Sequence, residues 1–226
     1  MVKIAMIKAE DLKRHPEDDR VVIINSMEDF NLWEHRKALG FKAVLLPKAF
    51  SEEECDFIAK DIVRATQQKA ETPDNVTEAF EETSYKAIMK PVGEYTPEGL
   101  QKDHNFAPLT VEKIEKCADL FKRLAEKKRF SVDNIHIRTN STHPHYPHTH
   151  GVSVAAVFSG TGTRFVKPDY EFTGENLDEN GHEKVPDPQY IYTVNAGDLM
   201  MFEDIWHIAG QLPENKSSPP RTQLLI

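Results

Sequence analysis

Cysteines and long apolar runs are scarce in this sequence, and both absences narrow the class of protein. Only Cys55 and Cys117 occur in 226 residues. We therefore expect no disulfide framework, and we expect a reducing, cytoplasmic location. No apolar run reaches the roughly 18 residues of a membrane span, so no transmembrane helix is predicted. The N-terminal segment also lacks the apolar core of a secretory signal.

Positive charge is in short supply as well. The chain has 28 lysines and arginines against 37 aspartates and glutamates, a formal net charge of −9. That balance argues against nucleic acid and anionic membranes as partners. Hydrophobic residues make up 39% and charged residues 29%, as in ordinary soluble globular proteins. The length fits a single domain, residues 1–226.

Helical patterns dominate the first part of the chain. N-cap signals followed by apolar residues at helical spacing predict helices at 26–39, 51–67 and 110–129. Short β-branched runs predict strands at 21–25 and 41–46. Residues 68–109 are polar with scattered proline and glycine, which indicates loops with short strands that could serve as a lid. Residues 1–130 are therefore interpreted as a helical buttress with loops.

Closely spaced strands follow after residue 130. They are predicted at 135–138, 152–158, 163–166, 190–194, 198–202 and 222–226. An acidic segment, 173–189, is expected to be a loop. Because the predicted helices come first in the sequence and the strands second, we predict an α+β fold. It would be a double-stranded β-helix (jelly roll) with N-terminal helices packed on one side. Residues 131–226 would hold the main jelly-roll strands and the functional site.

Histidines are concentrated in the second part. Four of the ten lie between His143 and His150, and His207 follows 57 residues after His150. His148 and His150 are two apart, so on a strand both imidazoles face one side. With His207 arriving from a distant strand, this spacing is typical of a mononuclear metal site. Three protein ligands leave coordination positions open for chemistry.

The simpler interpretation is a solvated histidine-rich loop that binds metal adventitiously. His143 and His145 fit a loop or a supporting role better than a ligand role. Trp206, just before His207, fits the core better than catalysis. Arg164 has no clear assignment, and a surface salt bridge is its expected role.

Three segments resemble the Fe(II)/2-oxoglutarate-dependent oxygenases, especially the prolyl-4-hydroxylase-like members. Residues 43–58 resemble the family's first strand and the helix after it. The run from His148 to Phe165 resembles the first ligand strand with its glycine turn. Residues 197–207, with Arg221 fourteen residues further, resemble the distal histidine and the cosubstrate arginine.

The resemblance implies a fold and a reaction. It implies a jelly roll that binds Fe(II) through His148, His150 and His207 and uses 2-oxoglutarate as cosubstrate. Arg221 would hold the far carboxylate of 2-oxoglutarate in a bidentate fork, with support from Thr222. The expected activity is that of a dioxygenase, an oxidoreductase that uses O2 to oxidise, and typically hydroxylate, a C–H bond of a small molecule or side chain. Arg138 and Asn140 are weaker candidates for substrate contacts.

The sequence departs from the family pattern at His150, where a carboxylate is usual. The favoured hypothesis makes His150 the third ligand of a three-histidine site. Alternatively His150 turns away and leaves two protein ligands, as in the iron halogenases of this superfamily. A remote carboxylate, from Asp169, Glu203 or Asp204, is the third alternative.

A three-histidine iron site is also the hallmark of cupin-type thiol dioxygenases, which use no 2-oxoglutarate. Arg221 and the helical first third argue against that alternative. A non-catalytic metal-binding domain is the remaining possibility, and it predicts metal binding without O2 consumption. Substrate identity and oligomeric state do not follow from the sequence.

Overall fold

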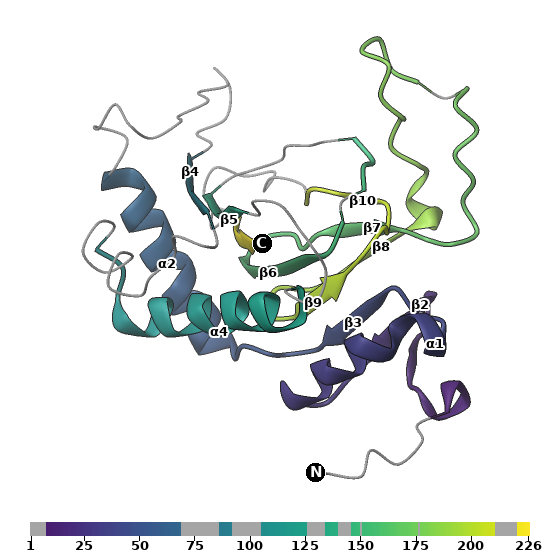
Figure 1. The fold of residues 1–226 in the computed structure, drawn as a ribbon. Helices are drawn as coiled ribbons and strands as arrows, with labels where there is room; N and C mark the ends of the chain where they lie inside the picture. Colours follow the sequence, from purple (N-terminus) through teal and green to yellow (C-terminus); the bar gives the residue numbers. More distant parts are fainter. Residues whose placement is uncertain are drawn as a thin grey trace.

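The computed structural model describes residues 8–68, 86–91, 105–125, 134–139, 146–149, 151–175, 177–210 and 221–226. In this part of the chain, helices lie against one face of a large sheet and a small sheet lies against the other (Figure 1). Its helices are all too short or too polar to cross a bilayer.

The strands form two sheets. The eight-stranded sheet has the order β1-β2-β3-β9-β6-β11-β5-β4, and the three-stranded sheet has the order β10-β7-β8. Their bounds are β1 (Arg14–His15), β2 (Asp18–Ile23), β3 (Ala43–Leu46), β4 (Lys86–Pro91), β5 (Asn134–Thr139), β6 (Ser153–Ser159), β7 (Arg164–Val166), β8 (Ile191–Thr193), β9 (Leu199–Phe202), β10 (His207–Ile208) and β11 (Thr222–Leu225). All pairings are antiparallel except β2 with β3.

Two α-helices cover the large sheet. The helical elements are η1 (Ala9–Asp11), η2 (Glu28–His35), α1 (Arg36–Leu39), α2 (Glu52–Gln68), α4 (Pro108–Ala125) and η5 (Pro188–Tyr190). Helix α2 begins at a capping box, because Glu54 N–H donates to Ser51 Oγ and Ser51 N–H donates to the Glu54 carboxylate. Gly40, with φ of 68°, ends α1 in the left-handed conformation that glycine adopts without a steric penalty.

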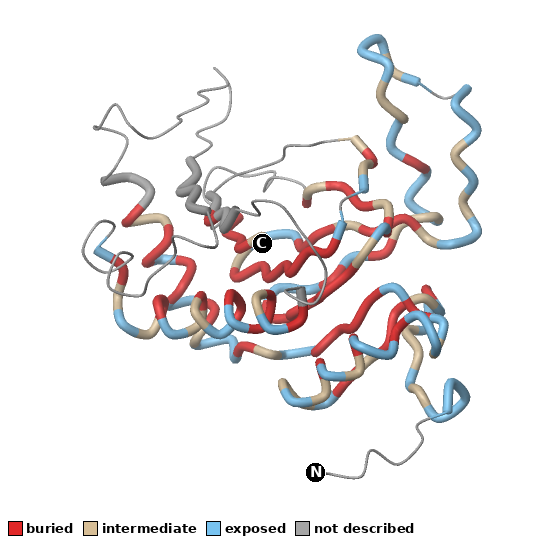
Figure 2. The backbone as a smooth tube through the Cα atoms, in the orientation of Figure 1, coloured by how far each residue is buried: buried red, intermediate tan, exposed pale blue. Residues whose placement is uncertain are grey.

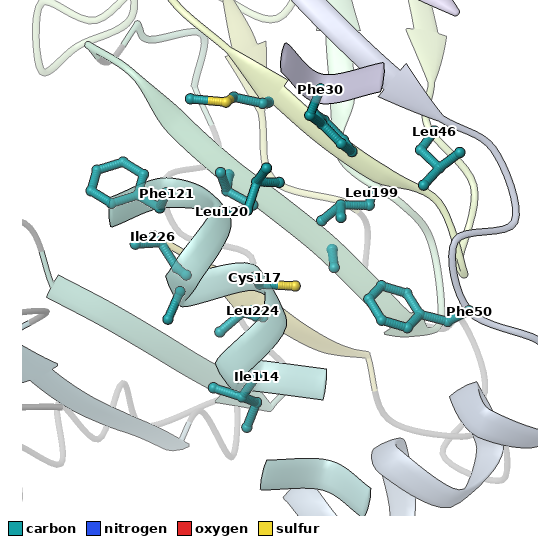
Figure 3. Close-up of a cluster of buried hydrophobic side chains, with 14 of the residues drawn as sticks. Phe30, Leu46, Phe50, Ile114, Cys117, Leu120, Phe121, Leu199, Leu224 and Ile226 are labelled. Atoms are coloured by element: carbon teal, nitrogen blue, oxygen red, sulfur yellow. The ribbon is translucent and has the colours of Figure 1, made fainter. Parts of the chain in front are cut away.

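Successive residues of the central strands serve two different cores. In β9, Leu199 and Met201 join a cluster with the helices, whereas Met200 and Phe202 join a cluster with the small sheet. We call these the helix-side core and the inter-sheet core. The alternation follows from the two-residue period of a strand whose two faces are both buried. Figure 2 shows buried residues along both sheets and on the inner sides of the helices, and Figure 3 shows the helix-side core.

The predicted mixed α+β class is confirmed, with strand-rich layers and helices on one side. The linking of the two sheets as a double-stranded β-helix stays a prediction, as does the single domain. The predicted helix at 26–39 is mostly a 3-10 helix, η2. Its buried Phe30 and Trp33 are three residues apart, which matches three residues per turn.

Two further boundaries differ from the sequence-based expectation. The helix predicted from Thr110 begins at Pro108, since proline is favoured in a first helical turn, and Thr110 is buried inside the helix. The first strand predicted at 21–25 begins at Asp18, which is buried and accepts hydrogen bonds from Arg20 and Tyr192. Most of 68–109 lies outside the described residues, apart from β4 and the start of α4.

Candidate metal and cosubstrate site

The structure brings His148 and His207 side by side, although they are 59 positions apart in sequence. The two residues form an isolated antiparallel bridge next to β10. His148 N–H donates to the His207 carbonyl at 3.1 Å, and His207 N–H donates to the His148 carbonyl at 2.9 Å. Their ring centres are 4.2 Å apart. The bridge therefore fixes the backbones of the two residues against each other.

Each imidazole has its Nδ1 within hydrogen-bonding distance of a backbone carbonyl two residues earlier. His148 Nδ1 lies 3.1 Å from the Tyr146 carbonyl, and His207 Nδ1 lies 2.9 Å from the Ile205 carbonyl. Because a carbonyl only accepts, Nδ1 carries the proton in both rings, and in a neutral imidazole this leaves the lone pair on Nε2. Proteins commonly orient metal-binding histidines through such a hydrogen bond to the other ring nitrogen.

The spacing of the two rings suits two ligands of one metal ion. Imidazoles bound cis, with nitrogens about 2.1 Å from the metal, would hold their ring centres about 4.5 Å apart. The observed separation is 4.2 Å. The donor set, neutral imidazole nitrogen, favours iron, copper, zinc or nickel over magnesium or calcium.

Aromatic side chains enclose His207. It is 4% exposed, and its ring centre lies 4.9 Å from that of Phe202 and 5.8 Å from that of Phe165. Phe165 and Phe202 belong to opposite sheets and pack edge to face. His148 is less buried. The inner ligand candidate thus sits in the inter-sheet core, while the outer one lies nearer to solvent.

The third predicted ligand, His150, lies outside the described residues, as do His143, His145 and Asn140. The three-histidine site therefore stays a prediction. Arg138 lies opposite Gln223 where strand β5 pairs with β11. Its side chain, like His150, is outside the described part of the chain.

The carboxylates that were considered as remote ligands lie elsewhere. Glu203 forms an ion pair with Arg36 at 2.5 Å, and the Arg36 guanidinium lies over the ring of Trp33. Asp169 and Asp204 are exposed. Within the described ranges, no group of three histidine, cysteine or acidic side chains is placed to hold a metal ion. No described carboxylate therefore completes the pair.

Arg221 is buried, at 1% exposure, directly before β11. Its Nε donates to the carbonyl of Thr161 at 2.7 Å. Glycines allow this close approach. A Cβ on Gly160 would lie 2.9 Å from the Arg221 Cα, and one on Gly210 would lie 2.5 Å from Nε. The arginine is thus held in one place by backbone on two sides.

Gly210 also relates Arg221 to the histidine pair. It follows His207 by three residues, and three residues of extended chain span about 10 Å. A Cβ on Gly210 would be one bond further and 2.5 Å from Arg221 Nε, so Nε lies within about 14 Å of the His207 Cα. Thr222 is buried as well, and its hydroxyl shares a 2.8 Å hydrogen bond with that of Ser159. Thr222 thus anchors β11 to β6 beside the arginine.

Arg164 departs from its expected role. It makes no surface ion pair with any described residue but donates from Nε to the Ala209 carbonyl at 3.1 Å. Burial lowers the pKa of its guanidinium below the ordinary value. The contact ties β7 to the chain between His207 and Gly210, so Arg164 supports that segment.

Sequence reasoning missed the contacts that flank the two histidines. The ring of His182 stacks on Tyr146, with centres 3.8 Å apart and planes within 6°. Phe172 packs on Trp206, with ring centres 4.2 Å apart. Trp206 was predicted to belong to the core. It is only partly buried, and Phe172 covers part of its ring. No local pattern signals these contacts, because each joins residues more than 30 positions apart.

A separate cavity of about 710 Å³ lies between α2 and the end of β6. It is lined by apolar side chains that include Phe50, Cys55 and Phe158, with charged residues around them. None of the predicted site residues lines it. The cavity is therefore distinct from the histidine pair.

Comparisons with known proteins bear on the fold alone. No family model matches the sequence, and no curated protein matches it. Among solved structures, a full-length Neurospora crassa protein in complex with alpha-KG is similar over 94% of this chain and 86% of its own, with 12% identity and a TM-score of 0.51.

Two other solved structures are more distant. A Pseudomonas putida prolyl-4-hydroxylase is similar over 86% of this chain and 95% of its own, with 10% identity and a TM-score of 0.47. The non-heme alpha ketoglutarate dependent carbocyclase SnoK is similar over 97% and 85%, with 13% identity and a TM-score of 0.45. This chain therefore has the overall fold of the Neurospora crassa protein, and its chemistry must be argued from its own residues.

Proposed function

We propose that the protein is a non-haem Fe(II)- and 2-oxoglutarate-dependent oxygenase that oxidises, most simply by hydroxylation, a C–H bond of a small molecule or side chain. The observation that carries the proposal is a buried arginine whose Nε lies within about 14 Å of the Cα of His207, one member of an oriented histidine pair. The fold shared with the Neurospora crassa protein, which was solved with alpha-KG, supports it.

His148 and His207 would hold the iron. Both present Nε2 lone pairs, because each Nδ1 proton is directed at a backbone carbonyl. Fe(II) supplies open positions for the cosubstrate and O2 when bound. In the overall reaction, 2-oxoglutarate loses CO2 to give succinate, so that one oxygen atom enters succinate and the other enters the substrate.

Arg221 would hold the distal carboxylate of 2-oxoglutarate. Its burial keeps water from competing for the guanidinium, and the contact of Nε with Thr161 fixes the direction of the side chain. Phe165 and Phe202 keep the inner face of His207 dry. The role of these groups is to bind, orient and exclude water.

We extend the proposal to His150 as the third ligand. Two variants test this extension: His150→Ala removes the imidazole, and His150→Asp introduces the carboxylate that is usual at this position. If His150 binds iron, the alanine variant loses iron affinity and the aspartate variant largely retains it. Equal iron affinity in the wild type and the alanine variant would contradict the extension.

The decisive experiment measures succinate. Protein loaded with Fe(II) without oxygen is mixed with 2-oxoglutarate and then exposed to O2, with and without a panel of substrates. Succinate should form even without substrate, by slow uncoupled turnover. If 2-oxoglutarate does not bind and a thiol drives O2 uptake instead, the protein is a thiol dioxygenase. Metal binding with no O2 consumption indicates a non-catalytic domain.

A further inference from the structure

Residues 167–190, except Asn176, form an extended arm between β7 and β8 that projects beyond the sheets (Figure 1). Its base is closed by a hydrogen bond from Lys167 N–H to the Tyr190 carbonyl, at 2.9 Å. Near its tip, Leu177 and Glu183 form an isolated antiparallel bridge. The arm is therefore a two-limbed loop with a defined turn.

The turn at the tip fixes His182. Asp178 N–H donates to the His182 carbonyl at 2.7 Å, and His182 N–H donates to the Asp178 carboxylate at 2.9 Å. The Asn180 N–H donates to the same oxygen at 2.8 Å. These backbone donors lower the pKa of Asp178, with His182 the largest cause, so the carboxylate stays ionised and the turn stays closed at neutral pH.

The fixed His182 ring lies flat on Tyr146, with ring centres 3.8 Å apart. Tyr146 is the residue whose carbonyl accepts the Nδ1 proton of His148. Its own ring also meets that of His148 edge to face, at 6.0 Å. A short path of contacts therefore leads from the arm to the outer histidine of the pair.

The first limb of the arm contacts the residue that precedes the inner histidine. Phe172 packs on Trp206, which directly precedes His207 and follows Ile205, the acceptor for the His207 Nδ1 proton. The arm thus contacts a neighbour of each histidine, Tyr146 through His182 and Trp206 through Phe172. Of these two neighbours, Tyr146 is the one whose own carbonyl accepts a histidine Nδ1 proton.

We propose that His182 is a positioning residue for the metal centre, acting through its stack on Tyr146 to hold the carbonyl that orients His148. The inference rests on the proposed metal site. Groups that orient a ligand in this way are worth about 10-fold to 100-fold in metal affinity. What matters here is a flat ring at position 182 rather than an imidazole, because the contact is a stack and not a hydrogen bond.

The test is a Co(II) titration of full-length variants, read by the d–d absorption spectrum, which reports the metal's geometry. His182→Ala should weaken Co(II) binding about tenfold and shift the bands. His182→Phe restores a stacking ring and should restore both the affinity and the spectrum. Tyr146→Phe keeps ring and carbonyl and should match the wild type.

The matched control is His15→Ala. His15 also packs its ring on a tyrosine, Tyr192 at 4.9 Å, and lies in β1. It should leave Co(II) binding unchanged. If His182→Ala does not fold, Tyr146→Ala removes the same stack from the other side and should show the same loss.

Three results overturn the inference. The first is wild-type affinity and spectrum in His182→Ala. The second is a His182→Phe variant as weak as His182→Ala, which would mean that the imidazole itself matters. The third is a wild-type protein that binds no Co(II), which overturns the proposed metal site and this inference with it.

Discussion

The two faces of the large sheet carry different kinds of residue. The helix-side core packs apolar side chains from β6, β9 and β11 against α2 and α4 (Figure 3). The inter-sheet side adds buried polar groups to an apolar cluster, among them Asp18, His207 and Arg221. The same strands build both faces, because alternate residues point in opposite directions.

The buried polar groups on the inter-sheet side are held by one another and by backbone. Tyr192 Oη donates to Asp18 at 3.0 Å, and Arg20 forms an ion pair with the same carboxylate at 2.7 Å. Burial is the largest cause that raises the pKa of Tyr192 well above its ordinary value. Such groups cost free energy to bury unless they are paired. The comparison therefore separates a face of packed apolar side chains from a face that also carries buried polar groups and the residues of the proposed site.

The strongest test of this separation removes the inner histidine. His207→Ala should abolish detectable turnover and lower metal affinity by more than about 100-fold, since ligands matter more than the groups that orient them. The fold should persist, because the loss of one buried imidazole leaves both cores packed. Metal stoichiometry and circular dichroism measure the two effects, with exposed His35→Ala as the control. Full activity in His207→Ala would refute the site.

The second test removes an apolar side chain from the helix-side core. Ile114 is fully buried in α4, so Ile114→Ala should lower the free energy of unfolding by about 3 kcal/mol through lost contacts and a cavity. Metal and 2-oxoglutarate affinities should stay within about twofold of wild type, because Ile114 faces the other core. Urea denaturation measures the stability, and exposed Asp119→Ala is the control. A change of about tenfold in metal affinity would mean that the two faces of the sheet are energetically coupled, which contradicts their separation.

Sequence reasoning succeeded where a pattern is local. The strand predicted at 198–202, the helix start at Ser51 and the helix end at Leu39 each depend on residues within a few positions, and the structure has them to within one residue. His148 and His207 lie side by side in the structure, but the two-residue period of a strand related His148 only to His150, and the metal-ligand roles stay a prediction.

The remainder depends on contacts that no local pattern encodes. His182 reaches Tyr146 only because the arm folds back across 36 residues of sequence. Gly210 reads as an ordinary loop glycine, and its role is visible only once Arg221 lies against it. Arg164 was expected on the surface, and only the register of β7 with β10 shows that it serves a backbone carbonyl.

A third test changes Arg221, the proposed 2-oxoglutarate-binding residue of the inter-sheet side. Arg221→Lys keeps the charge but loses the planar fork, so 2-oxoglutarate affinity should fall about 30-fold, the equivalent of one hydrogen bond to a charged group. Co(II) affinity should not change, because Arg221 is not a proposed ligand. Isothermal titration measures both. The control is Arg164→Lys, which should retain 2-oxoglutarate binding; equal losses in the two variants would contradict a specific role for Arg221.

A milder change alters the space around the Arg221 guanidinium. Gly210→Ala places a Cβ 2.2 Å from the Thr161 carbonyl oxygen and 2.5 Å from Arg221 Nε, the two atoms of one hydrogen bond, so both must shift and 2-oxoglutarate affinity should fall about tenfold. Gly40→Ala is the control for a local backbone change, because nothing lies within 4 Å of its Cβ position and the strain at its φ of 68° falls on the end of α1. Competition between 2-oxoglutarate and succinate for the loaded protein measures the shift. Unchanged affinity in Gly210→Ala would show that Arg221 does not need the space.

The smallest expected effect concerns alkaline pH and returns to the helix-side face. Burial raises the pKa of the Cys117 thiol from 9.0 to about 12. Above pH 9 the unfolded chain therefore loses a proton that the folded chain keeps, so the stability falls as the pH rises. The slope from this one group approaches about 1.4 kcal/mol per pH unit between pH 9 and 12. Cys117→Ala should flatten the fall in urea stability between about pH 8.5 and 10 by about 1 kcal/mol. Because the thiol lies in the helix-side core, metal affinity in the variant should follow the wild-type pH profile; an altered profile would mean that the two faces of the sheet are coupled.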